Sequence, residues 1–236
     1  MQLPKYSAYH IIGISNLDVR RVDSLDESDL TVFNEIIERV HHHYLAIRAE
    51  GYLRPAREVE YSRKFFEDHM AGDYQYVFLS AGKRDWKLPE QVRFGFIFDA
   101  FDLIEKGAIL RKYDLLSQYE SVLENLVAER IGWHNPQSSS TEETAIFSVT
   151  YKHLIGAVRG LDYEVPGVHE VLTQFRKEAR ELQSQMQLTD DAAKAYVVSQ
   201  WAFGHVELLF HEQLPLNWAV TVIENGEERG FYDTDT

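Results

Sequence analysis

One carboxylate stands within an otherwise largely apolar strand pattern near the C-terminal end of the chain. Residues 205–211 read His-Val-Glu-Leu-Leu-Phe-His, and Gly204 and Pro215 bound the run, which predicts a strand. Glu207 shares a face of this strand with Leu209. If that face lines a cleft, Glu207 is a candidate catalytic acid. If the strand lies at the edge of a sheet, the same carboxylate points into water, and this alternative stays open.

The composition describes a folded, acidic protein. Of the 236 residues, 44% are hydrophobic and 13% aromatic, which is enough for a sizeable core. The formal net charge of -14 argues against a protein whose main work is to hold nucleic acid by its phosphates, although a local basic patch still allows brief contact. The absence of cysteine excludes disulfides, a thiolate nucleophile and cysteine-ligated zinc. No apolar run reaches about 18 residues and no secretory pattern opens the chain, so we expect no membrane partner and a cytoplasmic location.

Familiar catalytic signatures are missing. The chain has no glycine-rich phosphate loop, no Gly-x-Gly-x-x-Gly, no His-Glu-x-x-His and no Gly-x-Ser-x-Gly, so common nucleotide hydrolases, dehydrogenases and zinc proteases are poor candidates. His41, His42 and His43 follow one another in a helical pattern, where neighbours point about 100° apart and cannot chelate one ion together. We therefore expect no metal site.

Strand and helix patterns follow one another without regular alternation. Strands are expected at 9–14, 76–80, 93–100, 145–151, 205–211 and 218–223, and the pair Asn225-Gly226 predicts a hairpin turn. Helices are expected at about 24–50, 56–70, 115–129, 168–187 and 189–204. This order indicates an α+β fold with a mixed sheet. We expect a single domain over 1–236, with a helical insertion at about 160–204.

Four stretches, in order along the chain, carry a resemblance to one enzyme family. They are 8–17 (Ala-Tyr-His-Ile-Ile-Gly-Ile-Ser-Asn-Leu), 50–55 (Glu-Gly-Tyr-Leu-Arg-Pro), 76–80 with 94–114, and 206–216 with its Val-Glu-Leu-Leu-Phe opening. They are similar to the opening strand, the glycine-containing turn, the middle strands and the late catalytic strand of the ADP-ribosyltransferase superfamily, in its nucleic-acid-modifying toxin branch. The resemblance implies a split, bent mixed sheet of that type and NAD+ as co-substrate.

The resemblance also implies roles for particular residues. These enzymes break the bond between nicotinamide and ribose of NAD+, and a carboxylate stabilises the positive charge that develops on the ribose. Glu207 takes that role. The residues implied in holding the dinucleotide are His10 for a ribose hydroxyl or an amide, Arg54 or Arg63 for the pyrophosphate, and Tyr9 or Tyr76 for stacking on nicotinamide. The ordinary alternatives are a buried histidine, a solvated arginine and core aromatics.

One departure from the family pattern concerns the acceptor. His205 stands two positions before Glu207, where members that modify arginine carry a second acid. We therefore expect another acceptor, and the sequence predicts an NAD+-dependent mono-ADP-ribosyltransferase, a toxin or phage-defence effector that modifies DNA or RNA and is restrained by an antitoxin or inhibitor protein. The rival interpretation is an acidic, non-catalytic immunity protein or antitoxin that masks a basic partner. A third is a related fold that binds NAD+ without transfer. Convergence of His10, an arginine and Glu207 on one site would separate the transferase from the acidic binding protein, and turnover of NAD+ would separate it from the fold that only binds NAD+.

Overall fold

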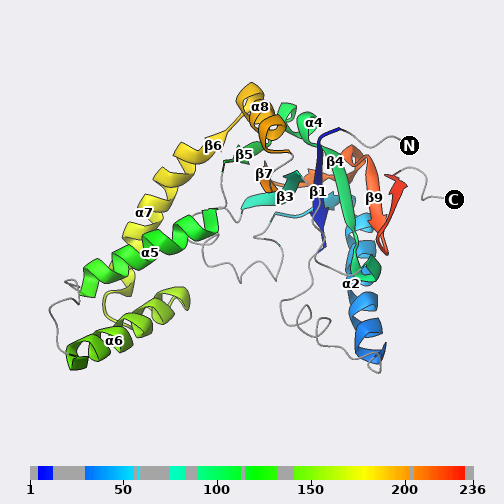
Figure 1. The fold of residues 1–236 in the computed structure, drawn as a ribbon. Helices are drawn as coiled ribbons and strands as arrows, with labels where there is room; N and C mark the ends of the chain where they lie inside the picture. The colour runs from blue at the N-terminus through cyan, green and yellow to red at the C-terminus, as the bar shows by residue number, and fades with distance from the viewer. Residues whose placement is uncertain are drawn as a thin grey trace. The chain divides into compact units, whose positions relative to one another are not determined.

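The chain forms two compact units. The computed structural model describes residues 5–12, 30–55, 58, 75–82, 90–112, 115–131, 141–201 and 205–231. Unit 1 comprises Met1–Glu58, Tyr76–Lys112 and Leu188–Thr236, and unit 2 comprises Val59–Gln75 and Tyr113–Gln187. Unit 1 holds the sheet, whereas the described part of unit 2 consists mainly of three long helices (Figure 1).

An eight-stranded sheet forms the centre of unit 1. Its order is β10-β9-β4-β1-β3-β7-β5-β6, with the bounds β1 Ser7–Ile11, β3 Tyr76–Gly82, β4 Gly95–Asp99, β5 Ile109–Arg111, β6 Gln187–Leu188, β7 His205–His211, β9 Thr221–Glu224 and β10 Glu227–Gly230. A separate two-stranded sheet pairs β2 (Tyr52–Leu53) with β8 (Leu214–Pro215). The strand pairs of the larger sheet run mostly antiparallel, which confirms the α+β class.

The junction between β1 and β3 is narrow. β1 pairs with β4 over its whole length, from Ser7 to Ile11, and β3 pairs with β7 from Tyr76 to Gly82. The register between β1 and β3, in contrast, spans Ala8↔Ala81 and Tyr9↔Ser80. Two well-paired halves, β10-β9-β4-β1 and β3-β7-β5-β6, therefore meet over a short contact beside Tyr9 and Ser80.

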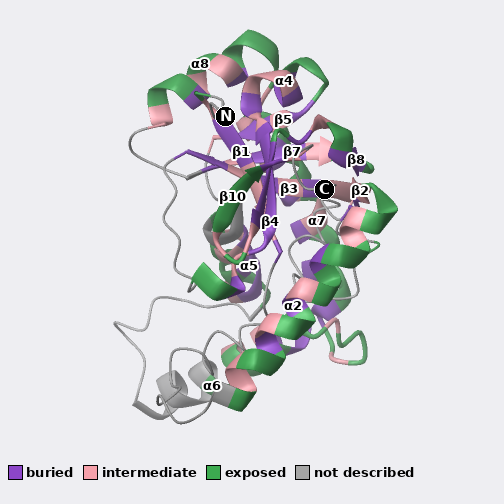
Figure 2. Cartoon of the chain, turned by 90° about the vertical axis from the view of Figure 1, so that its right-hand side faces the viewer, coloured by how far each residue is buried: buried purple, intermediate pink, exposed green. Residues whose placement is uncertain are grey.

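Helix α2 (Leu30–Glu50) covers part of one sheet face. Ile36, Val40 and Tyr44 recur every four residues, so they share one side of the helix, and all three are buried. The Tyr44 ring stacks on Phe96 of β4 with centroids 5.4 Å apart. Figure 2 shows β4 as buried and α2 with buried residues along one side. The same apolar core contains Leu79, and it extends to residues of α8 (Asp190–Gln200).

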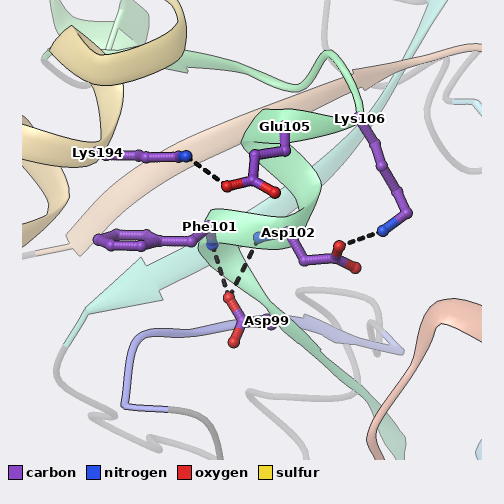
Figure 3. A network of polar contacts seen from close by, with 6 residues as sticks. All are labelled: Asp99, Phe101, Asp102, Glu105, Lys106 and Lys194. Carbon is purple, nitrogen blue, oxygen red and sulfur yellow. Dashed lines mark hydrogen bonds and ion pairs between the residues drawn. The ribbon is translucent and has the colours of Figure 1, made fainter.

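A short helix, α4 (Ala100–Glu105), follows directly from β4 because Asp99 caps it. The Asp99 carboxylate accepts from the backbone N–H of Phe101 at 2.8 Å and of Asp102 at 3.2 Å (Figure 3). Lys194 of α8 donates to Glu105 at 2.6 Å, and this ion pair joins α8 to α4. Two helices are thereby fixed beside the sheet.

The turn after β9 has the predicted structure, whereas β9 itself starts later than predicted. Asn225 and Gly226 have φ values of 52° and 78° between β9 and β10, which confirms the predicted hairpin turn. The strand predicted at 218–223 begins later, at Thr221, because Leu216–Trp218 forms a 3-10 turn. A second such turn, Glu90–Val92, precedes β4.

Unit 2 has its own apolar core. Helices α5 (Leu115–Ile131), α6 (Thr141–Arg159) and α7 (Val168–Met186) pack together around a buried cluster that includes Leu123, Val158, Leu172 and Phe175. The Tyr119 ring meets Phe175 edge-on at 5.9 Å. A helical trio with a continuous core is able to exclude water without support from a sheet.

The strand predicted at 145–151 is wrong. That segment lies inside α6, whose later residues Leu154, Ala157 and Val158 recur at helical spacing and are buried. The unit boundaries also differ from the insertion expected at about 160–204. Unit 2 includes the chain from Tyr113 and ends at Gln187, and α8 belongs to unit 1.

We predict that Gly95→Ala destabilises the protein by about 1–3 kcal/mol, the usual cost of overpacking. A Cβ at Gly95 would press on the carbonyl oxygen of His10 and lie 2.9 Å from Ile11 Cδ1, so β1 and β4 would have to separate. Urea unfolding followed by circular dichroism measures the loss. Gly156→Ala is the control, because a Cβ there meets open space in helix α6 and gains up to about 1 kcal/mol in helix propensity. Equal effects of the two changes would contradict the prediction.

Candidate active site

Four polar or aromatic residues from four strands lie in one row across the sheet. Ser80 is opposite Glu207, Arg111 is opposite Glu207 from the other side, and Tyr9 is opposite Ser80. Directly opposed residues of antiparallel strands point to the same face, so Tyr9, Ser80, Glu207 and Arg111 share one. It is the face opposite to that of Leu79, so the row does not belong to the main apolar core. The row also crosses the narrow junction between β1 and β3.

Glu207 is held by an ion pair with Arg111. Arg111 Nη1 donates to Glu207 Oε2 at 3.0 Å, and the exposed fractions of the two side chains are 3% for Arg111 and 29% for Glu207. The Arg111 guanidinium also lies 5.7 Å from the centroid of the Phe78 ring. A buried guanidinium against an aromatic ring restrains the carboxylate while leaving it partly accessible.

The alternative of an edge strand is wrong for Glu207. β7 lies between β3 and β5, paired on both sides through Ser80 and Arg111. A half-buried carboxylate at the centre of a sheet costs more to keep than one in water, because desolvation penalises its charge. Its position therefore calls for a reason beyond solubility.

Tyr9 and Tyr76 lie on the same face as Glu207 at different distances. Tyr9 belongs to the row, whereas Tyr76 starts β3 opposite His211, four residues before Ser80. Four residues of strand span about 13 Å. The Tyr76 ring meets the His211 ring edge-on at 5.4 Å. Tyr9 is consequently the better placed of the two predicted aromatics for a ligand beside Glu207.

His10 fastens the junction between the two halves of the sheet. It follows Tyr9 in β1, so its side chain leaves the sheet on the face opposite to that of Glu207, and the two do not converge. His10 is paired with Phe96 of β4, and its Nδ1 donates to the backbone oxygen of Phe78 at 2.9 Å. Burial lowers the pKa of His10 below 6.5, the Phe78 hydrogen bond opposes this, and the charge of His43 lowers it further. A carbonyl only accepts, so the proton is on Nδ1 and Nε2 is an acceptor. The ring is therefore neutral at pH 7.

Of the two predicted arginines, Arg54 is the one within the described residues, and its ion-pair partner is Glu50, not Glu207. Arg54 binds Glu50 through two hydrogen bonds, of 2.9 Å from Nε and 2.8 Å from Nη2, and it is exposed. Arg63 lies outside the described residues. The turn before Arg54 does approach the segment that follows β7, because Leu216 N donates to Gly51 O at 2.9 Å and β2 pairs with β8.

Arg111 is the residue that sequence reasoning missed. It stands 96 positions before Glu207, and its only local signal is a cation that closes the short apolar run Ala108–Leu110. An arginine and Glu207 do converge, but the arginine is not one of those expected. Among the described residues, no group of three or more His, Asp or Glu side chains is arranged to hold a metal ion. None of the described helices is long and apolar enough to cross a membrane.

Comparison with known proteins identifies no relative: no family model, no curated protein and no solved structure matches the chain.

A double-mutant cycle tests the ion pair. Arg111→Met leaves the Glu207 carboxylate without its cation, and because Glu207 is partly exposed we expect a loss of about 1–3 kcal/mol, less than for a fully buried pair. In a Glu207→Gln background, the same Arg111→Met change should cost at least about 1 kcal/mol less. Urea unfolding of the four proteins gives the coupling. An Arg111→Met cost that is the same in both backgrounds would show that the pair is not coupled.

A second prediction concerns the protonation of His10. Long-range proton–nitrogen NMR should find the proton on Nδ1 at pH 7 and a pKa below 6.5, as its burial requires. Because the pKa is lower in the folded state, the unfolded chain binds more protons below pH 6.5. The free energy of unfolding therefore decreases as the pH drops below 6.5, by up to about 1.4 kcal/mol per pH unit. His10→Gln should reduce that slope, because it removes the group whose pKa burial lowers. A proton found on Nε2 would refute the assignment.

Proposed function

We propose that this protein is an NAD+-dependent mono-ADP-ribosyltransferase with Glu207 as its catalytic carboxylate. The observation that carries the proposal is the half-buried Glu207, held by Arg111 on a central strand and aligned with Tyr9 and Ser80 at the narrow β1–β3 junction. A restrained, partly accessible carboxylate is what a reaction with a cationic sugar transition state requires.

The chemistry follows from the residues in the row. The bond between C1′ of the ribose and the nicotinamide nitrogen breaks, and the electron pair leaves with neutral nicotinamide. Glu207 stabilises the positive charge on the ribose ring, the acceptor attacks C1′, and its proton passes to the carboxylate and then to water. Arg111 limits reorganisation of that carboxylate during the reaction.

The resemblance assigns His10 to a ribose hydroxyl or an amide, but His10 alternates with Tyr9 and leaves the sheet on the face opposite to that of Glu207. Its contribution to the proposed site is therefore indirect: its hydrogen bond to Phe78 O holds β1 against β3 beside the row. Tyr9, one position earlier, offers an aromatic face on the Glu207 side of the sheet. For the pyrophosphate, Arg54 would have to leave Glu50, and Arg63 is the other candidate that the family resemblance gives. Tyr76 is the second candidate for stacking on nicotinamide.

The arrangement of the resembling stretches supports the proposal. β1, β3 and β7, from three stretches far apart in the sequence, are neighbours in the sheet, and the fourth stretch, the glycine turn at Gly51, lies beside the segment that follows β7. The short β1–β3 register agrees with the split sheet that the resemblance implies. Nucleic acid remains the proposed acceptor. The alternative, an acidic binding protein, is supported by net charge alone and gives no reason for a partly buried Glu207 that is bound to an arginine.

Glu207→Gln tests the proposal, because glutamine keeps the shape of the side chain and removes the charge. We expect the wild type to release nicotinamide from labelled NAD+ in the presence of mixed DNA and RNA, and the variant to be slower by about 10²–10³. Glu212→Gln, at an exposed position five residues further on, should keep full activity. Circular dichroism checks that each variant is folded. Equal rates for Glu207→Gln and the wild type, or no turnover of NAD+ by the folded wild type with any nucleic acid or protein acceptor, would overturn the proposal.

A further inference from the structure

Helix α7 of unit 2 divides its exposed surface by charge. Consecutive residues of an α-helix are about 100° apart around its axis, and this spacing places four buried residues on one side of α7: Val171, Leu172, Phe175 and Ala179. On the exposed surface, His169, Thr173, Arg176, Lys177 and Arg180 follow one side of the helix, and Glu170, Gln174, Glu178 and Glu181 follow the other. The first set, whose cations are Arg176, Lys177 and Arg180, is called the α7 cationic stripe below. From His169 to Arg180 it runs for about 16 Å, the length of eleven helical rises.

Several other cations of the described chain bind a carboxylate, and the cations of this stripe do not. Arg54, Arg159, Lys194 and Arg229 each bind a carboxylate. Among the described residues, neither Lys177 nor Arg180 forms an ion pair with an acid, although acids outnumber bases 38 to 24 in the sequence. In so acidic a chain, cations that face solvent without a carboxylate partner are available to an external anion.

An exposed aromatic ring stands at one end of the stripe. Tyr163 is 50% exposed, and its ring centroid lies 6.3 Å from that of His169, at an interplanar angle of 54°. Arg176 Nη2 donates to the Tyr163 hydroxyl at 3.3 Å, which ties the ring to the cations. Thr173, Arg176, Lys177, Arg180 and Glu181 line a shallow hollow of about 390 Å³. An aromatic face next to a row of cations combines the two groups that hold an unpaired nucleotide strand.

We propose that the α7 cationic stripe and Tyr163 form a binding surface for single-stranded nucleic acid. The cations contact successive phosphates, and Tyr163 stacks on a base whose face is accessible because the strand is unpaired. An acidic protein would satisfy the cations but would leave the exposed ring without a planar partner. The inference names an acceptor class for the proposed transferase and rests on that function in this respect only. Binding itself needs no NAD+.

Fluorescence anisotropy tests the surface. It measures the affinity of the full chain for a labelled single-stranded oligodeoxynucleotide of about 20 nucleotides at several salt concentrations. Lys177→Ala/Arg180→Ala should weaken binding and lower the slope of log affinity against log salt by about 1.4, the loss of two phosphate contacts. Tyr163→Ala should weaken binding at least about fivefold, while Tyr163→Phe, which keeps the ring, should bind within about twofold of the wild type.

The matched control removes two cations elsewhere. Lys152→Ala/Arg229→Ala changes the net charge by the same amount at exposed positions and should leave affinity within about twofold. Equal losses in this control and in the stripe variant, or no binding by the wild type at about 50 mM salt, would overturn the proposal. So would polyglutamate that competes as well as unlabelled oligonucleotide, which would assign the surface to an acidic protein. Glu207→Gln should bind normally, so a failure of catalysis and a failure of binding are separately visible.

Discussion

The pairing of β7 with β3 and β5 is the constraint on which the candidate site depends. It sets Glu207 between Ser80 and Arg111, and the separate register of β1 adds Tyr9 to the same row. A slip of one residue in either pairing of β7 would turn Glu207 toward the apolar core and Leu208 toward the site. The seven-residue ladder with β3 makes such a slip costly. The site is therefore a product of sheet register and does not depend on a single loop.

The ion pair at the centre of this row is hard to explain by stability alone. Arg111 is 3% exposed, and removing a guanidinium from water costs several kcal/mol before Glu207 returns any of it. Apolar residues of similar volume often serve a fold as well or better in such places. A pair of this kind is most useful where a carboxylate has to stay charged and oriented. The proposed reaction would impose that requirement, and Glu207 is 29% exposed.

The sequence predicted the parts of the fold that local patterns control. Alternation around Glu207 predicted β7, and Asn225-Gly226 predicted a turn whose positive φ values suit those residues. The strand expected at 145–151 failed because alternation over a few residues does not outweigh helical spacing that continues to Val158 and packs on unit 2. Arg111 was missed for a related reason: its partner is 96 residues away, and nothing local indicates which strands will be neighbours.

The net charge of the chain and the charge of a surface are different quantities. A charge of -14 argues against nucleic-acid binding only if a strand experiences the whole protein at once. At physiological salt the screening length is about 8 Å, so a phosphate beside Lys177 responds to charges within about one or two turns of α7. In the nearest turn on either side, Arg176, Lys177 and Arg180 outnumber Glu178 and Glu181, and Glu178 lies on the other side of the helix; over two turns Glu170 brings the acids to the same number as the bases. The surrounding acids then limit where a strand can settle, because they repel it from the rest of the described surface and leave the cationic stripe as the favourable place. On this argument, an acidic protein with one local basic surface gains selectivity of placement at the expense of affinity.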